Sequence, residues 1–256
     1  MGKESGARIV LPETNDKRIQ DAVTELISSG FEVLNHDDFQ DNYDTYLEYI
    51  NKLSFTDNWP EKNLREYLDD PLHFSMAMSA CDAADGVIAG AATPSSEVIR
   101  SAIRLIGIHP NAKNVSSIFF MIAPKGDTAY TFADCAVMPE PDSKQLAAIA
   151  GDSAEFHQLL TGDEPKVAFL SFSTKGSASH YRVDRVRDAV EIFAHKFPNI
   201  IHDGEVQVDA AIIPQINQKK IPGSPLEGKA NVLIFPNLDA GNIAYKIAQR
   251  MGGFSA

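Results

Sequence analysis

Short apolar runs alternate with segments of helical periodicity along most of this 256-residue chain. The apolar runs, bounded by polar or turn-forming residues, predict buried strands. They cover residues 7–13, 31–34, 86–90, 114–124, 128–137, 166–172, 206–213 and 230–236. Apolar residues that recur three and four positions apart predict helices over residues 16–30, 71–84, 95–107, 143–160, 181–196 and 241–251.

Strands that alternate with helices predict an α/β fold, in which helices cover both faces of a parallel sheet. We expect Asp70 to cap the helix that begins at Pro71, because aspartate favours the N-cap and proline the first helical position. The polar segment 109–114 is the expected boundary between a first α/β domain, residues 1–110, and a second, residues 111–256. Residues 36–70 show no periodicity, and no element is predicted there.

The formal net charge of −12 argues against a nucleic-acid-binding protein, which needs a basic surface to displace phosphate counterions. No apolar stretch approaches the ~18 residues of a membrane span, and the first residues carry no apolar signal region. Cys81 and Cys135 match no disulfide, zinc or redox pattern, so we expect buried thiols. The histidines show no metal-ligand spacing. We therefore expect a cytoplasmic protein that binds neither nucleic acid nor membranes.

The segment AGAATPSSEVIR, residues 89–100, is the first candidate anion site. A predicted strand ends at Gly90, and Ser95 or Ser96 stands where a helix N-cap is expected. Backbone N–H groups and the helix dipole attract phosphate to such a position. Arg100 lies one helical turn after Ser96, where a guanidinium can bind the same anion in a bidentate manner. The alternative is an ordinary capped helix with a surface arginine.

The segment FSTKGSASH, residues 172–180, lies between a predicted strand and a predicted helix. It is not a nucleotide P-loop, because Lys175 precedes Gly176 and no earlier glycine has the required spacing. Its small polar residues are typical of a nest of backbone N–H groups that binds an anion. A polar strand-to-helix turn with a serine N-cap explains the pattern equally well.

The third candidate spans residues 219–246, where two lysines precede a Pro-Gly-Ser-Pro turn and a buried strand. Ligands of open parallel sheets gather beyond the carboxyl ends of the strands, which favours these loops. Asn242 and Tyr245 offer directional hydrogen bonds, and Lys220 offers a positive charge to an anion. The alternative for the lysine pair is a solvated surface.

Taken in order, these segments resemble the phosphate acetyltransferase (phosphotransacetylase) family, to which phosphate butyryltransferases are also similar. The resemblance is carried by IVLPE, DGVIAGAATPSSEVIR, FADCAVMPEPDSKQLAAIA, KVAFLSFSTKGSASH, DGEVQVDAAIIP and KKIPGSPLEGKANVLIFPNLDAGNIAYKIAQR. It covers nearly the whole chain from Ala7, is highly specific from Asp85 onward, and is weak between His36 and Asp70.

The resemblance implies two α/β domains of the isocitrate/isopropylmalate dehydrogenase type, with the active site in a cleft between them, and a homodimer. It also implies the reversible conversion of acetyl-CoA and phosphate into acetyl phosphate and CoA. In that reaction a carboxylate deprotonates the CoA thiol, and the thiolate attacks the carbonyl of acetyl phosphate. Coenzyme A is thus a substrate, and no metal is required.

The resemblance further implies roles for the candidate residues. Arg100 looks like the family's substrate-phosphate arginine, and Ser95, Ser96 and Lys220 look like its neighbours around acetyl phosphate. On the CoA side the resemblance implies Ser173, Thr174, Lys175, Gly176 and Ser177, together with Asn242, Tyr245 and Lys246.

Two departures from the family pattern shape our expectation of activity. The family usually continues past the helix ending in QR to a DLSRG segment with a catalytic serine and arginine and a nearby aspartate base, whereas this chain reads QRMGGFSA to Ala256. A stretch like ELRKHKG, with a substrate arginine, is replaced by NKLSFTDNWPEKN, and Arg65 is no positional match. We therefore expect impaired transacetylase activity and a first domain that is incomplete without a C-terminal return segment. The alternatives are a phosphate butyryltransferase-like acyltransferase and a catalytically inactive module that binds CoA or acetyl phosphate.

Overall fold

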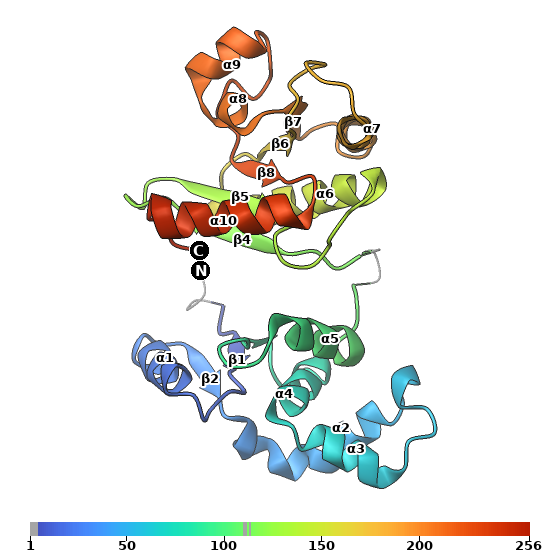
Figure 1. Cartoon of the computed structure of the whole chain (residues 1–256). Helices are drawn as coiled ribbons and strands as arrows, with labels where there is room; N and C mark the ends of the chain where they lie inside the picture. Colours follow the sequence, from blue (N-terminus) through green and yellow to red (C-terminus); the bar gives the residue numbers. More distant parts are fainter. Residues whose placement is uncertain (1–4, 110–111, 113) are drawn as a thin grey trace. The chain divides into compact units, whose positions relative to one another are not determined.

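The structure, a computed structural model, describes residues 5–109, 112 and 114–256. The chain divides into two compact units, residues 1–112 and 113–256, and each has its own sheet and hydrophobic core (Figure 1). Three residues of the expected boundary segment 109–114 lie outside the described residues. No helix in the described part of the chain combines the length and the apolar character needed to cross a membrane.

The first unit is built on a three-stranded parallel sheet in the order β2-β1-β3. Its strands are β1 (Arg8–Val10), β2 (Glu32–Leu34) and β3 (Gly86–Val87), and its longer helices are α1 (Lys17–Ser28), α4 (Pro71–Ala80) and α5 (Ser95–Leu105). The predicted cap of α4 is confirmed, because the Asp70 carboxylate accepts hydrogen bonds from the N–H groups of Leu72 (2.9 Å) and His73 (3.2 Å). The local sequence thus fixes where this helix begins.

The segment 36–70, for which the sequence predicts no element, is mostly helical. It contains η1 (His36–Asn42), α2 (Tyr43–Ile50), η2 (Ser54–Thr56) and α3 (Glu61–Leu68). Tyr46, Ile50, Leu64 and Leu68 from these helices are buried in the core of the first unit. The helices are only two turns long, so an apolar period does not become visible in the sequence.

The second unit contains a five-stranded sheet in the order β4-β5-β8-β6-β7. Its strands are β4 (Ile118–Ile122), β5 (Ala129–Ala133), β6 (Lys166–Leu170), β7 (Ile201–Val206) and β8 (Val232–Ile234). β4 and β5 form an antiparallel pair, whereas every other neighbouring pair is parallel. The predicted α/β class with parallel sheets is therefore confirmed, with one antiparallel edge strand.

Helices cover both faces of this sheet (Figure 1). α6 (Ser143–Thr161) and α7 (Tyr181–Lys196) share one core with Val167 and Phe169 of β6. α8 (Val208–Ile212), α9 (Pro214–Lys220) and α10 (Leu238–Gly252) share the opposite core with Ala168 and Leu170. Successive side chains of a strand point to opposite faces, and both faces of this sheet are covered, so β6 is apolar from Val167 to Leu170.

The predicted strand over residues 206–213 is wrong. β7 lies earlier, at Ile201–Val206, where it pairs with all of β6. The chain then turns into α8, whose Ala210 and Ala211 are buried against the sheet. The alternation in VQVDAAII is too short to separate a strand from a helix, and the length of the partner strand decides the outcome.

Candidate active site

Ser95 and Ser96 are the first two residues of α5, and both are exposed. The expectation that one of them is the N-cap is wrong, because Pro94 occupies that position in an extended conformation (φ −58°, ψ 138°). A proline side chain offers no acceptor to the first turn, so α5 has no side-chain cap. Among the described residues, neither the hydroxyl nor the backbone N–H of either serine has a hydrogen-bond partner.

Arg100 lies four residues after Ser96, on the same side of α5. Its side chain is exposed and forms no hydrogen bond or ion pair with any described residue. An exposed guanidinium near a helix start with free donors is able to bind an anion. The structure therefore brings the three predicted residues of the first unit together on one helix.

The loop before α5 is an anion nest, but a carboxylate of the chain itself fills it. Both oxygens of Glu13 accept hydrogen bonds from four consecutive N–H groups. The donors are Gly90 (3.0 Å) and Ala91 (2.8 Å) to Oε2, and Ala92 (2.8 Å) and Thr93 (2.6 Å) to Oε1. Partial burial raises the pKa of Glu13, but the N–H donors outweigh it and lower this pKa to about 2. Sequence analysis did not identify Glu13, which lies 77 or more residues from these donors.

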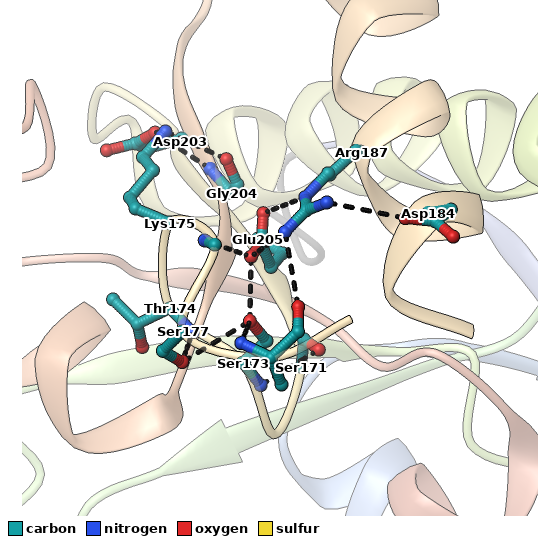
Figure 2. A network of polar contacts seen from close by, with 12 residues as sticks. Ser171, Ser173, Thr174, Lys175, Ser177, Asp184, Arg187, Asp203, Gly204 and Glu205 are labelled. Carbon is teal, nitrogen blue, oxygen red and sulfur yellow. Dashed lines mark hydrogen bonds and ion pairs between the residues drawn. The ribbon is translucent and has the colours of Figure 1, made fainter. Parts of the chain in front are cut away.

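The loop from Ser173 to Ser177, between β6 and α7, is also organised around a carboxylate (Figure 2). Oε1 of the buried Glu205 accepts hydrogen bonds from the Ser173 hydroxyl (2.8 Å) and the Gly176 N–H (2.8 Å). Arg187 of α7 holds the same carboxylate through Nε (2.9 Å) and Nη2 (3.1 Å). Burial raises the pKa of Glu205, yet Arg187, Gly176 and Ser173 outweigh it and lower this pKa to about 2.

The remaining N–H groups of this loop also have partners inside the second unit. Thr174 donates to the Ser177 hydroxyl (2.9 Å), and Lys175 donates to the carbonyl of Glu205 (3.1 Å). The Lys175 ammonium donates to Asp203 and to the Gly204 carbonyl (2.8 Å for the latter). Among the described residues, Gly176 is the one member of this loop whose backbone N–H contacts the Glu205 carboxylate, so the loop does not form the predicted nest of several N–H groups around one anion.

Lys220, the last residue of α9, is linked to the same loop by one intermediate residue. Its ammonium donates to Asp209 Oδ2 (2.8 Å) and Gln207 Oε1 (2.8 Å). The backbone N–H of Gln207 in turn donates to the Thr174 hydroxyl (3.0 Å). The hydrogen bond from Lys220 lowers the pKa of Asp209, so this carboxylate is ionised at neutral pH. The structure thus places Lys220 next to the loop that follows β6.

The predicted residues of α10 form a separate group. Asn242 Nδ2 donates to the carbonyl of Cys135 (3.0 Å), just after β5, and Lys246 donates to Asn242 Oδ1. The Tyr245 ring stacks on Phe119 of β4 with 3.9 Å between ring centroids. Among the described residues, no hydrogen bond links Asn242, Tyr245 or Lys246 to the loop after β6.

The remaining candidates for chemistry are unreactive. Burial raises the pKa of Cys135 to about 12 and raises that of Cys81, so both thiols are protonated at neutral pH. In the described part of the chain, no three His, Cys, Asp or Glu side chains are grouped so as to hold a metal ion.

Comparison with known proteins shows which family the chain is similar to. The family model described as "Phosphate acetyl/butaryl transferase" matches residues 28–256. The phosphate acetyltransferase of Thermoanaerobacterium thermosaccharolyticum is 40% identical in an alignment 259 residues long, which covers 99% of this chain and 78% of that protein. The phosphate acetyltransferase of Staphylococcus aureus is 40% identical in an alignment 277 residues long, which covers 97% of this chain and 84% of that protein.

Solved structures agree in fold. The EutD phosphotransacetylase from Staphylococcus aureus superposes with a TM-score of 0.81 at 38% identity, over 98% of this chain and 84% of the other. A phosphotransacetylase from Streptococcus pyogenes gives a TM-score of 0.84 at 32% identity, over 98% and 83% of the two chains. A branched-chain phosphotransacylase from Enterococcus faecalis shares the fold alone, with a TM-score of 0.69 at 16% identity. The resemblance seen in the sequence is thus confirmed, and the chain belongs to the phosphate acetyl/butyryl transferase family of acyltransferases.

Proposed function

We propose that this chain acts as a phosphate acetyltransferase that interconverts acetyl-CoA plus phosphate and acetyl phosphate plus CoA. Family membership and 40% identity to proteins named phosphate acetyltransferase support the reaction type. The two-domain arrangement of the isocitrate/isopropylmalate dehydrogenase type, a homodimer and a cytoplasmic location are part of this proposal. In it, the first unit supplies the groups for the phosphate and the second unit those for CoA.

The phosphate group of acetyl phosphate binds at the start of α5. The observation that carries this assignment is the combination of unpartnered donors on Ser95 and Ser96 with the exposed guanidinium of Arg100, which pairs with no described residue. The positive end of the helix dipole adds to their attraction for a phosphate. Other cations of the candidate set, such as Lys220 and Lys175, already pair with carboxylates.

On the CoA side, the loop from Ser173 to Ser177 is a rigid surface against which CoA packs, and its backbone N–H groups do not bind a phosphate of CoA. Its backbone donors are consumed within the second unit, so its contribution is shape together with the exposed part of Lys175. Lys220 supports this surface through Gln207. Asn242, Tyr245 and Lys246 form a second contact surface on α10.

The chemical step is a direct acyl transfer. A carboxylate takes the proton of the CoA thiol, the thiolate attacks the carbonyl carbon of acetyl phosphate, and a tetrahedral oxyanion forms. When the oxyanion collapses, the bond between the carbonyl carbon and the phosphate oxygen breaks and phosphate leaves. Arg100 and the two serines stabilise the charge on the leaving phosphate.

The experiment is an assay of acetyl-CoA formed from acetyl phosphate and CoA, with butyryl phosphate in parallel. Arg100→Ala is expected to raise the KM for acetyl phosphate and to lower kcat/KM by about 10²-fold, with little change in the KM for CoA. The matched control is Arg104→Ala, one turn further along α5, whose guanidinium lies over the Phe55 ring (5.4 Å). Equal effects of Arg100→Ala on both substrates would refute the assignment.

The same assay distinguishes the alternatives. A preference for butyryl phosphate would replace the acetyl assignment by a phosphate butyryltransferase. CoA binding without turnover would favour an inactive binding module.

A further inference from the structure

The segment that follows β1 holds the loop before α5 from both its N–H side and its carbonyl side. Glu13 accepts all four N–H groups from Gly90 to Thr93, as described above. Arg18, at the start of α1, donates through Nη2 to the carbonyl of Ala91 (2.5 Å) and to Asp16 (2.6 Å). The loop conformation is thus held by residues 73 or more positions away.

This arrangement decides which donors at the strand-to-helix turn are left for a ligand. The N–H groups of Gly90, Ala91, Ala92 and Thr93 are consumed by Glu13, and Pro94 has no N–H. The Glu97 N–H donates to the Pro94 carbonyl (2.9 Å). Within the described chain, the donors without a partner at this turn are therefore those of Ser95 and Ser96. These are the residues assigned above to the phosphate of the substrate.

The charge of Glu13 has a second consequence. With a pKa of about 2, the Glu13 carboxylate is ionised at neutral pH. The four N–H groups therefore already hold an anion, and a phosphate is excluded from this nest. A phosphate that approaches this turn is directed to the serines and to Arg100. The N–H groups of Gly90–Thr93 thus have a structural role. They lie directly before Ser95 and Ser96, which are the residues proposed to bind the phosphate.

We propose that Glu13 is a positioning residue: by filling the nest of Gly90–Thr93, it fixes the start of α5 so that Ser95, Ser96 and Arg100 present one phosphate site. This inference rests on the proposed function, because it takes the start of α5 as the phosphate end of the reaction. Without the carboxylate, four backbone N–H groups would lose their partners, and the loop would sample other conformations. Phosphate affinity then falls in proportion to the population of the competent loop.

The test uses the full chain with Glu13→Ala and the isosteric Glu13→Gln, and formate as the probe that replaces the missing carboxylate. Amide hydrogen exchange and backbone amide NMR shifts of Gly90–Thr93 report the loop, and titration with inorganic phosphate reports the site. We expect Glu13→Ala to lose protection of the four amides and to bind phosphate at least about tenfold more weakly than the wild-type chain. Formate should restore both the amide protection and the phosphate affinity, and each effect should saturate as the formate concentration rises. The KM for CoA should stay within about twofold.

Glu97→Gln is the matched control, because Glu97 lines the same cavity of about 360 Å³ but makes no hydrogen bond to the loop through its side chain. It should show protected amides and no response to formate. Glu13→Gln keeps the side-chain volume and one acceptor oxygen, and should give an intermediate loss of phosphate affinity.

The possible outcomes separate the two proposals. If the wild-type chain binds no phosphate, the proposed function fails. If the wild-type chain binds phosphate and folded Glu13→Ala binds it equally well, the role of Glu13 is refuted while the proposed function stands. The role is also refuted if formate restores amide protection without restoring phosphate affinity, because a positioned loop would then be irrelevant to the site.

Discussion

The guanidinium of Arg187 holds the carboxylate of Glu205 through two hydrogen bonds of 2.9 and 3.1 Å, and the two partners differ sharply in exposure. The Glu205 side chain is 3% exposed, whereas that of Arg187 is 37% exposed. Glu205 also holds Ser173 and Gly176, so one carboxylate joins β7, α7 and the loop between β6 and α7 (Figure 2). The conformation of this loop therefore depends on the ion pair.

Arg187→Ala is predicted to destabilise the second unit strongly. The substitution leaves the buried Glu205 carboxylate without its positive partner, which should lower the free energy of unfolding. Urea unfolding measures the loss. Arg182→Ala, on the same helix, is the control, since its ion pair with Glu140 (3.9 Å) is exposed and should contribute little to stability. Similar losses of unfolding free energy in the two variants would show that the Arg187–Glu205 pair stabilises the fold no more than an exposed ion pair does.

The depressed pKa values of Glu13 and Glu205 predict a specific acid dependence of stability. Both groups have a pKa of about 2 in the folded chain against an ordinary value of 4.5. Below pH 5 the unfolded chain therefore binds more protons than the folded one, and the stability that these groups contribute is lost as the pH falls toward 2. Urea unfolding at a series of pH values should show this decline, and Glu205→Gln should flatten it. Stability that is constant between pH 5 and pH 2 would contradict these values.

Gly241 predicts a packing constraint at the start of α10. A Cβ atom there would lie 2.4 Å from the carbonyl oxygen of Asp134 and 2.9 Å from Cys135 Sγ. Gly241→Ala must push α10 away from the end of β5, which should cost about 1–3 kcal/mol in the free energy of unfolding. Gly252→Ala, near the other end of the helix, meets only the Phe254 ring at 3.3 Å and should be neutral or stabilising, since alanine favours a helix by about 0.5–1 kcal/mol. Equal stability of the two variants would contradict this packing.

The sequence predicts the α/β class and most elements because their signals are local. Asp70 and Pro71 mark the start of α4, and the apolar runs mark β6 and β8. Long-range pairing decides the places where the prediction is wrong. β7 ends where its partner β6 ends, so the residues after Val206 form a helix although their pattern alternates.

The candidate site shows the same limit. Local composition predicts that the loops at residues 89–100 and 172–180 offer several backbone N–H groups to an anion. In the first loop four N–H groups hold Glu13, whereas in the second the Gly176 N–H alone contacts the Glu205 carboxylate among the described residues. Local composition does not reveal either carboxylate, because Glu13 and Glu205 lie 77 and 29 residues away from the glycines that they contact. Pro94 likewise takes the cap position that the serines were expected to hold, and this leaves their donors free.

The proposed function depends most directly on transfer of the acetyl group from acetyl-CoA to phosphate. A single-turnover exchange measures this transfer most directly. Acetyl-CoA and radiolabelled inorganic phosphate are mixed with the chain at a concentration equal to that of the substrate, so that a slow enzyme is still detected. We predict labelled acetyl phosphate with the wild-type chain and about 10²-fold slower labelling with Arg100→Ala. The absence of labelled acetyl phosphate from a wild-type chain that binds both substrates would contradict the proposed function.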